Sequence, residues 1–140
     1  MIVPANLYLL DLREFERELF RMSFPPEGLF PERRITKDFI TRRIGNVIWV
    51  LPGGLGYSLS DHVTAAMKKP GREVHSLARG TPLPEGVVLS LDKTPGSEGH
   101  YMLCPATPMP AAEFVGKLQR IAENPIYCRQ LSTAEVNNGK

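Results

Sequence analysis

The most regular pattern of apolar and polar positions lies in residues 99–122, GHYMLCPATPMPAAEFVGKLQRIA. Tyr101–Cys104 is an apolar run of strand length, and the prolines that follow prevent either neighbouring element from continuing. Within Ala111–Ala122, apolar residues recur at intervals of three and four, which is the spacing of one buried helical face. The pattern therefore predicts a strand, a proline-containing turn and an amphipathic helix that Asn124-Pro125 ends.

Shorter apolar runs predict strands elsewhere in the chain. Asn46–Leu51 is nearly continuous in apolar and β-branched residues and contains the single tryptophan, so we expect a central strand that is covered on both faces. Ile126–Leu131 is expected to pack as a last segment. The other predicted strands are Asn6–Leu10, Val74–Leu77 and Val87–Leu91.

Three more helices are predicted from start and stop signals. Leu12–Met22 follows an acidic start and has apolar residues at helical spacing. A short helix is expected from Thr36, with Gly45 placed to end it. Ser58, with Asp61 three residues later, fits the capping pattern of a third helix.

Proline and glycine are both frequent, with 13 prolines and 12 glycines among 140 residues. This composition favours a loop-rich α+β domain of short elements over a helical bundle. The length suits one domain with one core, which we place at residues 1–131. Residues 132–140 are predicted to form a flexible C-terminal tail.

The charge and the cysteine content of the chain indicate a cellular location but do not identify a binding partner. A formal net charge of +2 does not require a polyanionic partner. Cys104 and Cys128 lack metal-ligand spacing, and no charged-then-apolar leader begins the chain, so we expect reduced thiols in a cytoplasmic protein. No run approaches the roughly 18 apolar residues of a transmembrane helix, so no membrane partner is expected.

The glycine-rich segment Pro52–Ser58, PGGLGYS, is a candidate ligand site. Glycines allow backbone N–H groups to approach a ligand, and the start of the predicted helix would favour phosphate oxygens, so a dinucleotide pyrophosphate fits there. The segment lacks the lysine of a P-loop and the spacing of a Rossmann fingerprint. The alternative interpretation is a loop with a capping serine.

Histidines and other catalytic signatures exclude some classes of enzyme. His62, His75 and His100 do not have HExxH spacing, so no metal site is predicted. The G-x-S-x-G nucleophile elbow does not occur, which argues against an α/β-hydrolase. Each histidine taken alone is more typical of a packed or solvent-exposed residue than of a catalyst.

A basic segment lies within the first third of the chain. Its cations could bind RNA or an acidic protein, but nearby Glu32 and Asp38 and the lack of interleaved aromatic residues favour a solvated helix face. No strong nucleic-acid signal is therefore present. The basic residues are Arg33, Arg34, Lys37, Arg42 and Arg43.

Three segments, taken in order, resemble a known family. They are Gly56–Ser58 with Asp61, then Leu83–Gly86 before a strand, then the His-Tyr-(x)3-Pro-x-x-Pro-Met segment His100–Met109 before the amphipathic helix. Their order and spacing resemble the Tse-two toxins, which are ADP-ribosyltransferase-like effectors of the type VI secretion system. The resemblance covers residues 7–122 and implies a toxin that acts in the cytosol of a rival bacterium.

The resemblance also implies a fold and a reaction. The implied fold is a single compact α+β domain with short helices that flank a split, mainly antiparallel sheet, in which the sheet clasps NAD. NAD is then the substrate, and the reaction is ADP-ribosyl transfer or NAD cleavage. The implied partners are a cytosolic target of unknown identity and a cognate immunity protein or antitoxin.

Two residues are the catalytic candidates that the resemblance implies. Ser58 would support the ribose or orient a partner, and His100 would hydrogen-bond a ribose hydroxyl and position it. The glutamate common among ADP-ribosyltransferases has no clear counterpart, since Glu98 only precedes His100 by two residues. Either candidate can also have a purely structural role.

Four residues are the implied NAD-binding candidates. Tyr8 and Tyr57 would stack on the nicotinamide ring, and Gly56 would admit the ligand to the backbone. The first strand of such proteins usually carries Leu-Tyr-Arg, whose arginine can hold the dinucleotide. Here Leu7-Tyr8 is followed by leucine, and Arg13 is the nearest substitute.

Two other functions are kept open. A ribonuclease-type toxin would use the basic segment and the histidines. A non-catalytic binding module with a degenerate site would account for the departures from the family pattern at the arginine and the glutamate.

Overall fold

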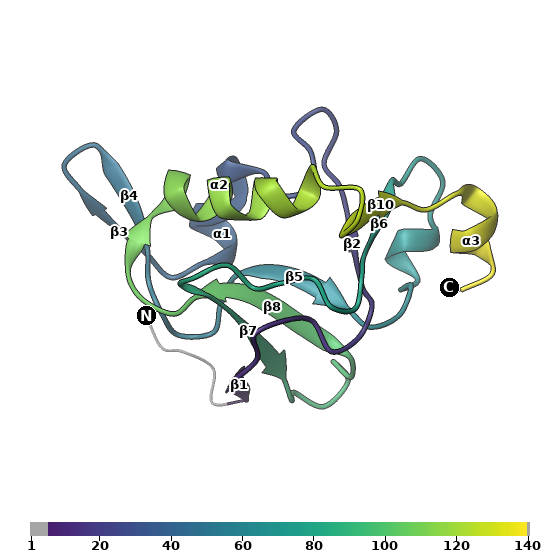
Figure 1. Cartoon of the computed structure of the whole chain (residues 1–140), viewed down its shortest axis with the longest axis horizontal. Coiled ribbons are helices and arrows are strands. Elements are labelled where there is room, and N and C mark those ends of the chain that lie inside the picture. The colour runs from purple at the N-terminus through teal and green to yellow at the C-terminus, as the bar shows by residue number, and fades with distance from the viewer. Residues whose placement is uncertain (1–5, 140) are drawn as a thin grey trace.

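The larger sheet has seven strands, and every neighbouring pair in it is antiparallel. The computed structural model describes residues 6–139. The strands predicted at Asn6–Leu10, Val74–Leu77, Val87–Leu91 and Tyr101–Cys104 are confirmed. Across the sheet (Figure 1) the order is β1 (Leu7–Leu10), β7 (Val87–Asp92), β8 (His100–Pro105), β5 (Tyr57–Ser60), β2 (Leu19–Met22), β6 (Val74–Leu77) and β10 (Cys128–Gln130).

The sheet is divided between β5 and β2. These two strands pair at one position, Phe20 opposite Ser60. By contrast, β2 pairs with β6 along its whole length, from Leu19 opposite Leu77 to Met22 opposite Val74. The predicted α+β fold with a split, mainly antiparallel sheet is therefore confirmed.

The helix predicted from the 3.6-residue pattern is confirmed as α2 (Ala111–Ala122). It lies across one face of the larger sheet (Figure 1). Phe114 and Leu118 are fully buried in the main core, and the Phe114 ring meets that of Phe39 edge to face, with centroids 5.3 Å apart. On β2, Leu19 belongs to this main core, whereas the next residue, Phe20, belongs to a second, smaller apolar cluster with Val74, so the two clusters lie on opposite faces of the sheet.

The predicted helix over Leu12–Met22 is wrong. Its last four residues are β2, of which the first three are all buried. The preceding residues run beside a second segment, because Phe15 N–H donates to the Thr81 carbonyl and Gly80 N–H donates to the Phe15 carbonyl. A helix exposes part of every turn, and surface charge pairs worth about 0.2–0.5 kcal/mol each do not outweigh burial of consecutive side chains.

The predicted helix from Ser58 is also wrong, and so is the capping-serine alternative. Ser58 lies within β5, where Tyr57 and Leu59 are buried and Ser58 between them is exposed. This alternation of two is the pattern of a strand. Within the described residues of this region, the helical turn is η2 (Ala66–Lys68).

The segment predicted as a helix from Thr36 to Gly45 forms two different structures. A 3-10 turn, η1 (Glu32–Arg34), leads into a four-residue helix, α1 (Ile35–Asp38), which ends before buried Phe39. The chain then forms β3 (Thr41–Ile44). Gly45 has a φ of 62°, so it stops β3 in a hairpin turn and does not cap a helix.

The smaller sheet contains the strand predicted at Asn46–Leu51, here β4 (Val47–Val50), between β3 and β9 (Met109–Pro110). The strand is confirmed, but its predicted burial on both faces is wrong. Val47 is 45% exposed, because the hairpin of β3 and β4 projects from one end of the molecule (Figure 1).

At the C-terminal end, the predicted last segment Ile126–Leu131 is confirmed in part: β10 pairs with β6, and Cys128 and Leu131 are buried, but Ile126 is 76% exposed. Beyond this segment the expected tail contains a helix, α3 (Thr133–Asn137), whose Ser132 and Glu135 form a capping box. Val136 is 8% exposed and joins the second apolar cluster. Residues 1–5 of the predicted domain and residue 140 of the predicted tail lie outside the described residues.

Two further properties concern the whole described chain. Cys104 and Cys128 are free and buried, as expected for reduced thiols. Among residues 6–139, no helix is long and apolar enough to cross a membrane.

Candidate functional site

A cavity of about 230 Å³ opens where β2 and β5 separate. Residues of β2, β5 and β8 line it together with residues of η1, α1 and η2 and of the segments next to them. Its walls therefore combine apolar side chains with two arginines, one carboxylate, serines and a histidine. The lining residues are Phe20, Arg21, Met22, Phe24, Arg34, Asp38, Ser58, Leu59, Ser60, Thr64, Met67 and His100.

Arg21 is the most unusual residue of the cavity, because its side chain is charged and only 5% exposed. Its Nε donates to the Leu29 carbonyl at 2.7 Å and its Nη1 to the Ser58 carbonyl at 2.8 Å, which bridges the gap between β2 and β5. Its guanidinium also lies over the Tyr57 ring, 4.8 Å from the centroid. These contacts hold the guanidinium in one orientation beside the cavity.

The guanidinium of Arg21 is nevertheless incompletely satisfied. Its Nη2 is buried and has no hydrogen-bond partner. Burial lowers the pKa of Arg21 to about 10, so the residue remains charged at neutral pH. A buried, charged N–H without an acceptor is costly to the fold, and an anionic ligand in the adjoining cavity would supply the acceptor.

Ser58 and His100, the two catalytic candidates, line the same cavity. Ser58 is exposed on β5, and His100 begins β8 opposite Ser60. The His100 Nδ1 lies 3.0 Å from a carboxylate oxygen of Asp92. Hydrogen bonds from Thr94 and His100 lower the pKa of Asp92, so an ionised carboxylate fixes the imidazole ring at the cavity.

Gly56 and Tyr57 occupy different places from those predicted. A Cβ added to Gly56 would collide with the backbone carbonyl of Leu103 on β8. Glycine at this position therefore allows the backbone that leads into β5 to lie close to β8. The Tyr57 side chain is fully buried, and its hydroxyl donates to the Pro31 carbonyl at 2.8 Å. Neither residue lines the cavity, and the Tyr57 ring is not accessible to a ligand.

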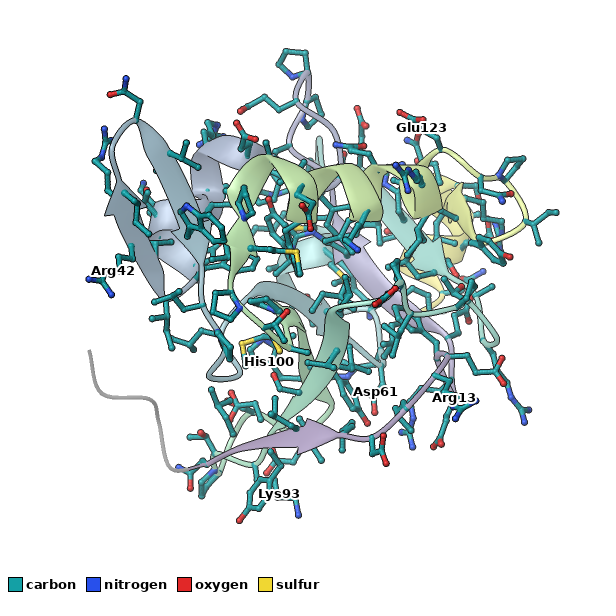
Figure 2. The ribbon with its side chains drawn as sticks, turned by 60° about the vertical axis from the view of Figure 1, so that its left-hand side comes forward. Arg13, Arg42, Asp61, Lys93, His100 and Glu123 are labelled. Carbon is teal, nitrogen blue, oxygen red and sulfur yellow. The ribbon has the colours of Figure 1, made fainter. Side chains whose placement is uncertain are left out.

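Tyr8 and Arg13, the other two binding candidates, also lie outside the cavity. Tyr8 is on the edge strand β1, 49% exposed, with the Lys93 ammonium 4.3 Å from its ring centroid. Arg13 is exposed at the edge of the molecule (Figure 2). The structure thus brings together Ser58 and His100 but not the predicted dinucleotide-binding residues.

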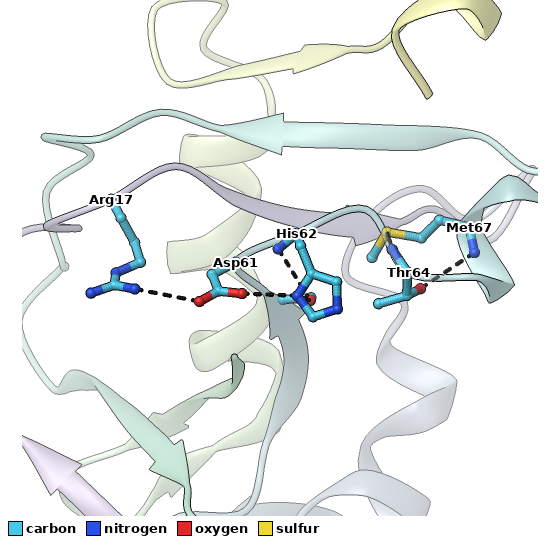
Figure 3. A network of polar contacts seen from close by, with 6 residues as sticks. Arg17, Asp61, His62, Thr64 and Met67 are labelled. Carbon is cyan, nitrogen blue, oxygen red and sulfur yellow. Dashed lines mark hydrogen bonds and ion pairs between the residues drawn. The ribbon is translucent and has the colours of Figure 1, made fainter. Parts of the chain in front are cut away.

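A polar network follows the end of β5, next to the cavity (Figure 3). The Asp61 carboxylate accepts a hydrogen bond from Arg17 at 3.3 Å and lies 2.9 Å from Nδ1 of His62. The same Nδ1 is 3.2 Å from the hydroxyl of Ser60. Because one ring nitrogen makes both contacts, the three residues do not form a Ser-His-Asp relay.

The remaining histidines do not add to the site. His62 is exposed, and the half-buried His75 lines a separate cavity of about 340 Å³. Burial lowers the pKa of His75, whose Nδ1 has no hydrogen-bond partner. In residues 6–139 no group of three or more histidine, cysteine or acidic side chains is arranged to hold a metal ion.

Arg21 is the residue that sequence reasoning missed. The tripeptide Leu19-Phe20-Arg21 is close to the Leu-Tyr-Arg expected on the first strand of the family, with phenylalanine in place of tyrosine. The sequence pattern predicts a helix over Leu12–Met22, so this tripeptide lies on no predicted strand, whereas the family motif is expected on the first strand, predicted at Asn6–Leu10. A search for the tripeptide in any apolar segment would have found it.

The comparisons with known proteins agree with this geometry. Residues 17–126, which are more than half of the chain, match the family model described as Tse2 ADP-ribosyltransferase toxin. The matched region begins after β1 and includes β2, β5, β8 and α2, so it contains every residue that lines the cavity. No curated protein and no solved structure matches the chain. The chain therefore belongs to the family of Tse2 ADP-ribosyltransferase toxins.

Proposed function

We propose that this toxin uses NAD+ as its substrate and binds it at the cavity between β2 and β5. The observation that carries the proposal is the unpaired, buried Nη2 of Arg21 beside a cavity that also contains Ser58 and His100. A phosphate oxygen of the dinucleotide would accept a hydrogen bond from this N–H. Charge-assisted hydrogen bonds of this kind are stronger than neutral ones, so the ligand would offset the cost of burying the guanidinium.

The reaction begins with cleavage of the bond between the nicotinamide nitrogen and C1′ of the ribose. The electron pair leaves with the nicotinamide, which becomes neutral, and positive charge develops on the ribosyl group. An oxygen or nitrogen nucleophile of the target, or water, then bonds to C1′ and loses its proton. Ser58 and His100 would hold the ribose in the geometry that this cleavage requires.

The size of the cavity suits part of the dinucleotide. Pockets that enclose a whole drug-sized ligand measure roughly 300–1,000 Å³. At about 230 Å³, this cavity would accommodate the nicotinamide riboside end, and the rest of the molecule would lie along the surface. The basic side chain of Arg34 at the rim would favour the pyrophosphate.

We also propose that the toxin acts in the cytosol and is neutralised by a cognate immunity protein or antitoxin. NAD+ is a cytosolic metabolite, and a cell that produces an NAD-consuming toxin needs protection from it. A secretion route of type VI, which the sequence resemblance implies, belongs to the same proposal.

The test compares purified wild-type protein with Ser58→Ala and His100→Ala variants in an assay of nicotinamide release from NAD+. We expect a loss of roughly 10²–10³-fold in each variant, the range measured when one preorganised polar group is removed from an active site. Arg79→Gln, on an exposed residue outside the cavity, is the control and should keep full activity. Wild-type protein that neither binds nor consumes NAD+ would refute the proposal.

The ribonuclease-type and binding-module hypotheses predict other outcomes of the same experiment. Rapid cleavage of RNA without NAD+ would favour a ribonuclease. No specific observation favours a ribonuclease, because His100 is the one histidine at the cavity in the described chain. Harmless expression together with no NAD+ binding would favour a binding module.

A further inference from the structure

One carboxylate, that of Asp38, is present among the described residues that line the cavity. Glu98 is exposed in the loop before β8, where it accepts a hydrogen bond from Gly96 N–H, and it does not line the cavity. Asp92 contacts His100 but also lies outside the lining. Within residues 6–139, the negative charge that lines this cavity is therefore that of Asp38.

The backbone that carries Asp38 is well anchored. Asp38 is the last residue of α1, and the residues that flank this turn, Ile35 and Phe39, are 1% and 2% exposed. The Phe39 ring packs edge to face on the Tyr57 ring, with centroids 4.9 Å apart. Because Tyr57 belongs to β5, this contact fixes α1 relative to the strand that carries Ser58.

The Asp38 carboxylate is also fixed by its neighbours. Arg34 Nε and Nη2 donate to its two oxygens at 3.2 and 3.1 Å, a bidentate pair one helical turn apart. Its side chain is 22% exposed, so it remains open to the cavity. Burial lowers the pKa of Arg21 and the charge of Asp38 acts in the opposite direction, and both residues line the same cavity.

The chemistry of the proposed reaction requires such a charge. When the bond from C1′ to the nicotinamide nitrogen breaks, positive charge moves onto C1′ and the ring oxygen of the ribose. Arg21 and Arg34 would raise the energy of this cation, whereas a fixed carboxylate lowers it, as in other enzymes that form an oxocarbenium-like transition state. The carboxylate needs no proton for this role and forms no bond to the sugar.

We propose that Asp38 is the carboxylate that stabilises the ribosyl cation in the transition state of NAD+ cleavage. This inference rests on the proposed function of the cavity. In this assignment Arg21 contacts the phosphate and Asp38 lies near the ribose of the nicotinamide nucleotide. The cavity then places a positive charge at the phosphate and a negative charge at the ribose whose bond to nicotinamide breaks. Asp38 then contributes to the rate of cleavage and little to the affinity for NAD+.

A second role for Asp38 would be to orient Arg34 alone. The two roles separate in a double-mutant cycle of Asp38→Asn and Arg34→Gln, measured as kcat for nicotinamide release and as Kd for NAD+ by calorimetry. Asparagine keeps the size and one acceptor oxygen of Asp38 and removes its charge. Asp11→Asn, on an exposed carboxylate outside the cavity, is the matched control.

We expect Asp38→Asn to lower kcat by about 10²-fold or more, with Kd within about threefold of wild type. The same loss of kcat should appear when Asp38→Asn is added to Arg34→Gln, and Asp11→Asn should match wild type. Urea unfolding of each variant checks that the fold is intact. If Asp38→Asn unfolds, Asp38→Glu replaces it and is expected to retain more activity than Asp38→Ala.

Three results would overturn the role of Asp38. The first is a kcat of Asp38→Asn within twofold of that of an active wild type. The second is a weaker Kd for NAD+ in Asp38→Asn with kcat unchanged. The third is no further loss of kcat when Asp38→Asn is added to Arg34→Gln. Absence of any NAD+ consumption by the wild type would instead overturn the proposed function, and the role of Asp38 with it. The two failures are thus distinguishable in one set of measurements.

Discussion

Gly56 offers the sharpest test of how the cavity strand is built. In a Gly56→Ala variant, the added methyl group would overlap the Leu103 carbonyl, which is backbone and cannot rotate away. Overpacking of this kind costs about 1–3 kcal/mol, and each strand hydrogen bond that weakens as β5 moves away from β8 adds about 1 kcal/mol. We therefore expect the free energy of unfolding to fall by about 2–4 kcal/mol, which corresponds to roughly 6–12 °C in Tm.

Gly116 provides the matched control, because the same substitution there should have the opposite sign. It lies within α2, and apart from its chain neighbours and the nearby backbone of its own helix nothing lies within 4 Å of a Cβ added at this position. Gly116→Ala should therefore stabilise the protein by about 0.5–1 kcal/mol through helix propensity. Urea unfolding with unchanged m-values measures both changes. A Gly56→Ala variant as stable as wild type that no longer binds NAD+ would refute the packing explanation and restore the predicted ligand role.

Three further predictions follow from named contacts. Ser132→Ala should lower the free energy of unfolding by about 1 kcal/mol through loss of the capping box of α3, and a urea curve identical to that of wild type would contradict an ordered C-terminal helix. Burial raises the pKa of Cys104 and of Cys128 to about 11. Near neutral pH, both thiols of the folded protein should therefore react with a thiol reagent at a small fraction of the rate measured for the protein unfolded in urea. Hydrogen bonds lower the pKa of Asp92 below 3.8, so the stability that they contribute is present above that pH and is lost as the pH falls through the folded-state pKa. The Asp92→Asn variant should therefore lose less stability than wild type on acidification. Equal losses of stability in the two proteins would contradict this.

The sequence predicted the elements whose pattern is local. The apolar positions of Ala111–Ala122 form the helix α2 in the structure, because their spacing and the flanking prolines act within one segment. The strand predicted at Val74–Leu77 is equally local. The family resemblance added the split of the sheet, and it brought Ser58 and His100 to notice before the structure placed them at one cavity.

The failures have a common physical cause. The segment before Met22 has apolar residues that fit a helical face, but β6 and the residues near Thr81 provide hydrogen bonds and burial that only an extended chain can use. The same holds for Ser58, whose capping pattern was outweighed by pairing of β5 with β8. Partners distant in the chain decided both cases, and a single sequence does not reveal them.

The error at β2 also determined which site residues were missed. Because the pattern predicts a helix that includes Leu19–Met22, it places Arg21 on no strand, and Arg13 is then the nearest candidate for the dinucleotide-binding arginine. From the sequence, Asp38 is a charge that offsets a basic segment, since its contact with Arg34 beside the cavity depends on how α1 packs against β5. The sequence thus pointed to Ser58 on β5 and His100 on β8, but not to the charged residues Arg21 and Asp38 that line the same cavity.

The most direct test of the central claim is a calorimetric titration of NAD+ into wild-type protein and into an Arg21→Gln variant. The account predicts that wild type binds NAD+ and that Arg21→Gln, confirmed as folded by urea unfolding, binds it at least about tenfold more weakly, which is the effect of losing about 1.4 kcal/mol of charge-assisted hydrogen bonding. If Arg21→Gln does not fold, Arg21→Lys provides the same comparison. Wild-type protein that does not bind NAD+, or a folded Arg21 variant that binds it as tightly as wild type, would contradict the account.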